Sequence, residues 1–139
     1  MFQLVLGLVL VLGINECSGK PPYGDAIPNG KAVPNPCAPA GTTWLGVGHT
    51  TPSGGGTRNL FGSNFLDEDL EWTNTLCTMD SDADGVSNGA ELGDPDCTWT
   101  KGAAPTRNAT GHPGICEPIS LVHCQLQNNN WNIQCDMYP

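Results

Sequence analysis

Cysteine content constrains the fold of this chain more than any other feature of its sequence. Seven cysteines are present in 139 residues, and six of them lie between Cys37 and Cys135. Six is an even number, the spacings are wide, and no Cys-x-x-Cys pair occurs. These properties favour three disulfide bonds in an oxidising compartment over a zinc site. Spacing alone leaves the pairing of the six cysteines open.

The N-terminal residues predict secretion and would remove the seventh cysteine. The apolar run Phe2–Ile14 is followed by a short polar segment that contains Cys17 and ends at Gly19. This length is typical of a signal peptide, residues 1–19, and is too short to span a bilayer as a helix. No later segment is apolar enough to span a membrane. We therefore expect a secreted, extracellular protein whose mature chain starts at Lys20 and forms one domain by its length.

Charge and composition limit both the partners and the core. The net charge is −9 at pH 7, which opposes binding to nucleic acid or to an anionic membrane surface. The chain contains 18 glycines and 12 prolines, residue types that favour turns and loops. A chain so rich in loops has a limited hydrophobic core, so disulfides and a bound metal are expected to supply part of its stability.

The segment from Asp80 to Glu91 matches the spacing of a calcium-binding loop. Ca²⁺ prefers six to eight hard oxygen ligands, and alternate residues of such a loop point their oxygens inward. Gly85 permits the sharp turn that this geometry requires. The expected ligands to Ca²⁺ are Asp80, Asp82, Asp84, the backbone carbonyl of Val86, Asn88 and Glu91.

Two departures from the calcium-sensor pattern predict a structural site. Ser87 stands where sensors carry an aliphatic residue that pairs two loops in a small sheet. Gly93 and Pro95 follow Glu91 closely, and both stop the helix that would leave the loop. A sensor works by opening two helices against each other. We therefore expect one EF-hand-like loop that stabilises the domain and does not act as a switch.

Secondary-structure signals are weak outside one segment. Residues 65–79 predict a helix that leads into the calcium loop, with Ser63 or Asn64 as its cap. Residues 42–49 contain β-branched and aromatic residues and predict one strand. The tail, residues 117–139, predicts two further short strands.

No motif of an enzyme is present. His49, His112 and His123 lack the spacing of a catalytic triad or of a paired-histidine metal motif, so we expect no enzymatic activity. A second metal at His49 and His112 stays an open alternative. The glycine-rich segment at residues 54–56 lacks the lysine and the strand–helix frame of a phosphate-binding loop. Asn108 begins an Asn-Ala-Thr sequon and is a candidate glycosylation site.

Five motifs occur in order along the chain: IPNGKAVPNPC, WLGVGH, GGGTRNLFGSNF, WTNTLCTMDSDADGVSNGAELGDPDCTW and GHPGIC. Together they closely resemble the temptins, a family of secreted, water-borne pheromone proteins of gastropod molluscs. The resemblance covers about Tyr23 to Cys116, and it is specific because rare residue types are combined over long spans. It implies a component of a mate-attraction complex that binds other secreted pheromone proteins, such as an attractin-like protein.

The resemblance also implies a metal site, a mainly antiparallel β fold and two disulfides. Carried over, the disulfides are Cys37–Cys116 and Cys77–Cys97, which leaves Cys124–Cys135 as an extra pair. The chain would then divide into a domain at residues 20–116 and a C-terminal extension at residues 117–139. Together with the helix, this gives a small disulfide-rich domain, mainly β and loop, with short antiparallel strands and one helix entering the calcium loop.

A different class of function suits some of the same features. An acidic, calcium-binding secreted protein could belong to an extracellular matrix or a biomineral. The pheromone interpretation is preferred because the acids cluster in one loop and one helix start, and not in the long repeats that bind mineral. For partner binding we expect a surface outside the metal loop, with Trp44, Trp131 and the glycine-rich segment as candidates.

Overall fold

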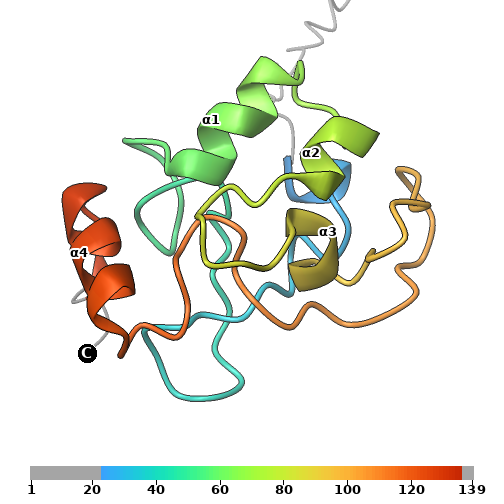
Figure 1. Ribbon diagram of the computed structural model, residues 1–139. Helices are drawn as coiled ribbons and strands as arrows, with labels where there is room; N and C mark the ends of the chain where they lie inside the picture. The colour runs from blue at the N-terminus through green and yellow to red at the C-terminus, as the bar shows by residue number, and fades with distance from the viewer. Residues whose placement is uncertain (1–22, 136–139) are drawn as a thin grey trace, which may run out of the picture.

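The architecture is a set of short helices joined by long, ordered loops (Figure 1). A computed structural model describes residues 23–135, so the predicted signal peptide at residues 1–19 lies outside the described residues. The expectation of a mainly β domain was wrong. Within residues 23–135 there is no β-sheet, and strand pairing is limited to two isolated bridges, Pro34–Thr43 and His49–Arg58. The helices are η1 (Tyr23–Ala26), α1 (Leu60–Asp67), α2 (Asn74–Thr78), α3 (Asn88–Glu91) and α4 (Val122–Asn130).

Close contacts between glycines replace the strand that was predicted at residues 42–49. The segment begins as extended chain, and the Trp44 amide donates to the Val33 carbonyl at 2.9 Å. It then turns and brings glycine backbones into close contact. A Cβ on Gly46 would lie only 2.3 Å from the Gly54 backbone, and a Cβ on Gly62 only 2.0 Å from the carbonyl oxygen of Gly48. Backbones that approach this closely cannot carry the alternating side chains of a sheet.

The single helix that was predicted at residues 65–79 is divided into α1 and α2. Asp69 and Leu70 both adopt left-handed conformations, with φ of 56° and 61°, and these end the first helix. A new helix starts where the side chain of Thr73 accepts a hydrogen bond from the Leu76 amide at 3.1 Å. The cap of α1 is Asn59, whose side chain accepts from the Gly62 amide, so neither Ser63 nor Asn64 caps it.

The tail forms a helix in place of the two predicted strands. Two apolar residues of this segment, Val122 and Leu126, are exposed in α4 and do not contribute to the core. The buried residues of α4 are Cys124 and Asn128, four positions apart on one face of the helix. Asn128 exchanges two hydrogen bonds of 3.0 Å with the backbone of Cys116. These contacts hold α4 at one edge of the molecule (Figure 1).

Two of the three disulfide pairings differ from those that the resemblance implied. The structure bonds Cys77 to Cys97 as expected. Cys116, however, is bonded to Cys124, and both are fully buried where α4 packs against the chain. Cys37 is bonded to Cys135 across a sequence separation of 98. The expected pairs Cys37–Cys116 and Cys124–Cys135 are therefore wrong. Both cysteines of the tail are bonded to the main domain, so the tail is fastened to it at two points.

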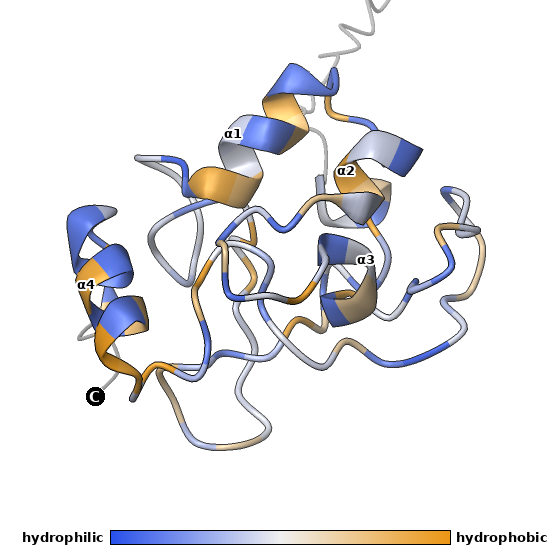
Figure 2. Cartoon of the chain, in the orientation of Figure 1, coloured by the Kyte–Doolittle hydropathy of each residue, from blue (hydrophilic) through white to orange (hydrophobic). Residues whose placement is uncertain are grey.

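The hydrophobic core takes Phe61 and Phe65 from α1 and Leu76 from α2, and the apolar parts of both helices are orange in Figure 2. Phe61 and Phe65 stack with their ring centroids 6.0 Å apart. The core cluster consists of Ala26, Ile27, Val33, Val47, Phe61, Phe65, Leu76 and Leu92.

No helix within the described part of the chain is long and apolar enough to cross a membrane.

Candidate metal site

The acidic loop runs from the end of α2 to the single turn of α3. Ser87, where a sensor has an aliphatic residue, caps α3 by accepting a hydrogen bond from the Ala90 amide. Gly93 has a φ of +81°, a left-handed conformation that ends the exit helix as the sequence predicted. The loop therefore joins two very short helices, and no long exit helix follows it.

Hydrogen bonds from backbone amides to aspartate carboxylates bring the aspartates of the loop together. Asp80 accepts hydrogen bonds from the amides of Asp84 and Gly85, at 3.2 and 2.8 Å. Asp84 in turn accepts from the Val86 amide at 2.9 Å. Gly85 has a φ of +99°, so the turn needs the glycine that the pattern placed there. The result is that one carboxylate oxygen from each of Asp80, Asp82 and Asp84 lies within 4.8 Å of the other two.

Two buried carboxylate oxygens in this loop have no hydrogen-bond partner among residues 23–135. They are Oδ2 of Asp82, a residue that is fully buried, and Oε2 of Glu91, a residue that is only 2% exposed. An unpartnered carboxylate oxygen in the interior is costly unless a cation compensates it. Both oxygens belong to residues that the calcium-loop pattern names as ligands.

Burial and like charges also raise the pKa values of these two groups. The pKa of Asp82 rises to about 8, mainly through burial and also through the neighbouring charge of Asp84. The pKa of Glu91 rises to about 10, again mainly through burial, with Asp82 and Asp84 adding repulsion. Without a cation these two carboxyl groups favour the neutral, protonated form, and a bound cation would compensate their buried charge and favour the ionised form.

Asn88 has an anchoring role in this structure. Its side chain is fully buried, and its amide donates to the Leu76 carbonyl and to Ser81 Oγ, both at 2.8 Å. Its oxygen accepts from the Ser81 amide at 3.3 Å. These bonds fasten the loop to α2, and they use both amide hydrogens and one of the two acceptor positions of Asn88. The Val86 side chain is 43% exposed, which suits a residue expected to offer only its backbone carbonyl.

A further acidic residue, Glu117, was missed by the sequence reasoning. Its amide donates to Asp84 Oδ2 at 3.2 Å, which places it against the loop although it lies far along the chain. Its own carboxylate accepts from the His112 amide at 3.1 Å. A Cβ on Gly111 would lie 2.8 Å from Glu91 Oε1 and 3.0 Å from Glu117 Oε2, so the two glutamates border the same glycine.

The position of Glu117 follows from tertiary contacts, and loop spacing gave no signal for it. Burial is the main cause of the raised pKa of Glu117, and the charge of Asp84 raises it further. The residue follows Cys116 directly, so the bond from Cys116 to Cys124 in α4 helps to hold it in place. Gln127 of α4 also donates a hydrogen bond to the Asp82 carbonyl. The tail thus contributes to the acidic site.

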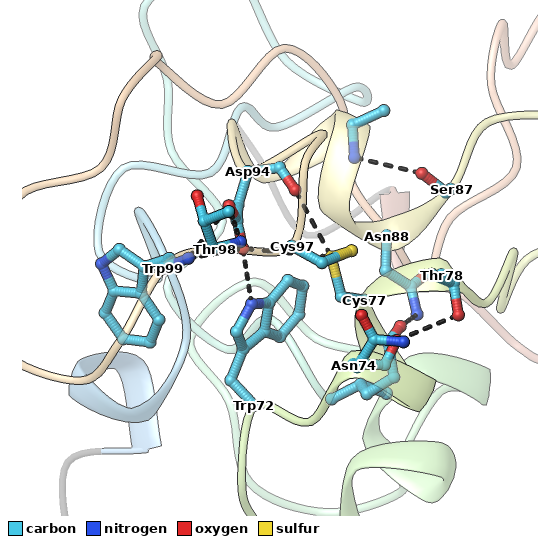
Figure 3. The surroundings of a disulfide bond; sticks show 12 residues. Trp72, Asn74, Cys77, Thr78, Ser87, Asn88, Asp94, Cys97, Thr98 and Trp99 are labelled. Carbon is cyan, nitrogen blue, oxygen red and sulfur yellow. Dashed lines mark hydrogen bonds between the residues drawn. A yellow bond between two sulfur atoms is a disulfide. The ribbon is translucent and has the colours of Figure 1, made fainter.

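The Cys77–Cys97 disulfide closes the chain around the loop (Figure 3). Cys77 precedes Asp80, and Cys97 follows Glu91, with a Cα–Cα distance of 5.8 Å. The turn before Cys97 is held by Asp94, which is 1% exposed. Asp94 accepts from the Trp72 ring nitrogen at 2.9 Å and from the amides of Thr98 and Trp99 (Figure 3). The acidic loop is thus enclosed by a covalent ring with a rigid closing turn.

The histidines and two tryptophans serve other roles. His112 is fully buried, its Nδ1 accepts from the Gly114 amide at 3.1 Å, and its ring lies edge-on to Trp44. Burial lowers the pKa of His112 to about 3, so the ring is neutral at physiological pH. Within the described residues, neither His49 nor His112 belongs to a cluster of three metal-ligating side chains. Trp44 is also fully buried, so the expectation that it forms a partner surface was wrong, whereas Trp131 is 42% exposed.

The structure therefore defines a class of protein: a small, disulfide-bonded domain built around one acidic loop and a covalent ring. Comparison with known proteins then identifies the family. Residues 17–115 match the family model of the temptin C-terminal region, and the chain belongs to the temptin family. It is 49% identical to Temptin of Aplysia californica over 105 residues, which is 75% of this chain and 82% of that protein. No solved structure matches the chain.

Proposed function

We propose that this protein is a secreted, non-enzymatic component of a water-borne pheromone complex. The observation that carries the proposal is the 49% identity to Temptin across 82% of that protein, since the temptins resembled here are pheromone proteins. Its action would be to bind other secreted pheromone proteins, of which an attractin-like protein is the first candidate. The three disulfides suit an extracellular compartment. Asn108, exposed on a loop, would be glycosylated there.

We further propose that the acidic loop holds one structural Ca²⁺. The ligands would be carboxylate oxygens of Asp80, Asp82, Asp84 and Glu91, together with the Val86 carbonyl. Glu117 would complete the oxygen set from outside the loop, which Asn88 is poorly placed to do because its side chain bonds to α2 and Ser81. The support is the pair of buried, unpartnered oxygens on Asp82 and Glu91, which hard oxygen chemistry matches to Ca²⁺.

A structural role fits this site better than a switching role. Calcium sensors respond by changing the angle between two helices, and α3 is a single turn of four residues. The disulfide between Cys77 and Cys97 also fixes the two ends of the loop against each other. Calcium would therefore stabilise the domain by binding only its folded form. Its effect on a partner would be indirect, through the order of the domain.

A pull-down tests the pheromone proposal. The mature protein, immobilised through its C-terminus, would be incubated with secretion from the reproductive glands of the source animal, in the presence of calcium. We expect it to retain a small, cysteine-rich secreted protein, identified by mass spectrometry. A sample with reduced and alkylated cysteines, which cannot form the three disulfides, serves as the unfolded control. Retention of no secreted protein, or equal retention by the control, would contradict the proposal. Expression confined to a matrix-forming epithelium would favour the matrix alternative instead.

A further inference from the structure

A groove of about 730 Å³ lies on the face formed by η1, the turn at residues 45–49, the glycine-rich segment and α1. Three large apolar side chains line it and remain accessible: Tyr23 is 39% exposed, Leu45 61% and Leu66 43%. Phe61 and Phe65 lie deeper along the same groove. The volume is within the range of sites that bind ligands, and exposed apolar residues gathered in a concave surface are typical of such sites.

Glycines open this groove by leaving its wall without side chains. Gly46 and Gly54 approach each other so closely that a Cβ on Gly46 would lie 2.3 Å from the Gly54 backbone. Gly48 and Gly62 make a similar contact, and all four residues line the groove. The groove is therefore a consequence of backbone packing, and it includes part of the glycine-rich segment that the sequence indicated as a partner surface.

The charges around the groove are opposite to those of the whole protein. The chain has 14 acidic and 5 basic residues, yet the lining contains the cations Lys31 and Arg58 and no aspartate or glutamate. Lys31 is already paired with Asp25 at 2.5 Å. Arg58 is exposed and forms no ion pair with any other residue in the 23–135 segment. An acidic partner would be repelled by most of the surface and attracted here.

We propose that this groove binds an acidic, apolar peptide segment of a partner protein. Apolar side chains of the segment would cover Tyr23, Leu45 and Leu66, and a carboxylate would pair with the guanidinium of Arg58. The inference rests on the proposed function, since it assigns a surface to the partner binding described above. It places that surface away from the acidic loop, so partner and calcium occupy separate sites.

A fluorescent synthetic peptide of alternating leucine and glutamate, with a free C-terminal carboxylate, provides the probe. Binding to the mature protein in calcium would be followed by fluorescence anisotropy. We expect saturable binding that Arg58→Glu weakens by at least about tenfold, the loss of one charge-assisted contact. Leu66→Gln should weaken it as well. Arg107→Glu is the matched control, because Arg107 is exposed and lies outside the groove, and this variant should bind as the wild type does.

The outcomes separate this inference from the proposed function. Equal binding by the Arg58→Glu and Arg107→Glu variants, or no binding to the wild type, would overturn the groove. Displacement of the peptide by decanoate at lower concentration would assign the groove to a small amphiphile, and self-association lost on Leu66→Gln would assign it to a second copy. Either result would overturn the proposal that the groove binds a peptide segment of a partner protein. If the peptide binds at Arg58 but no protein is retained from the secretion, the groove assignment stands and the proposal of a pheromone complex is contradicted.

Discussion

Removing the Cys77–Cys97 disulfide should weaken the fold and the metal site together. The two cysteines are separated by 20 residues, and a closed loop of this size restricts the unfolded chain by about 3 kcal/mol. Small domains are stable by about 5–15 kcal/mol, so the loss is a large share of the total. The variant is Cys77→Ala with Cys97→Ala, because alanine adds no polar atom at the fully buried position of Cys77.

The prediction for calcium is separate from the prediction for stability. Without the bridge, the chain on either side of the acidic loop can move apart, so the calcium dissociation constant should rise. Cys37→Ala with Cys135→Ala is the control. Its bridge spans 98 residues and should cost more stability, about 4.7 kcal/mol, yet neither cysteine bonds to a loop residue. Its calcium affinity should therefore fall less than that of the Cys77/Cys97 variant, because the Cys116–Cys124 bond still holds Glu117 and α4 beside the loop.

Two assays measure these effects. Urea unfolding followed by tryptophan fluorescence gives the free energy of unfolding, with calcium and with a chelator, and calorimetric titration gives the dissociation constant. A Cys77/Cys97 variant that keeps the wild-type calcium affinity would refute the idea that the ring holds the site in its binding geometry. An affinity that falls equally in both disulfide variants would show a general effect of destabilisation.

Three further results follow from single contacts of the site. Gly111→Ala should weaken calcium binding in calorimetry, because its Cβ would displace Glu91 Oε1 and Glu117 Oε2 from their present positions. Asn88→Ala should lower the melting temperature at a cost of about 1–3 kcal/mol, since the Leu76 carbonyl and Ser81 lose their buried partner. In chelator, the free energy of unfolding should fall as pH rises from about 4 to about 8, because the folded state keeps a proton on Asp82 that the unfolded state releases. Saturating calcium should remove most of this slope, and a flat profile in chelator would contradict the raised pKa.

The sequence was most informative where one local rule governs the structure. Alternating aspartates with Gly85 at the sixth position require one turn, and the structure forms it with the expected left-handed glycine. Gly93 ended the exit helix for an equally local reason. The membership of the temptin family was also correct, because five long motifs in a fixed order are specific. The signals for the turn and for the helix end lay within a few neighbouring residues, whereas the family signal lay in motifs spread from about Tyr23 to Cys116.

Long-range packing accounts for what the sequence did not predict. The left-handed pair Asp69 and Leu70 breaks a helix without a glycine or a proline, so local propensity gave no sign of it. The tail was predicted as two strands, but its buried residues Cys124 and Asn128 are four positions apart on one face of a helix. Glu117 reaches the acidic loop only through the fold. The β expectation came partly from the resemblance and partly from the residues at 42–49 and in the tail, and the close glycine contacts lie in the first of these two segments.

A calcium titration of the mature protein tests the central claim most directly. We expect one site with a dissociation constant of roughly 10⁻⁴–10⁻³ M, the range of extracellular calcium loops. Glu91→Gln should abolish binding, because it removes the buried carboxylate with the unpartnered oxygen, and Glu117→Gln should weaken it. Glu71→Gln, at an exposed acid outside the loop, should bind as the wild type does. No binding to the wild type, or the same affinity in the Glu91→Gln variant, would contradict the assignment of the loop as a calcium site.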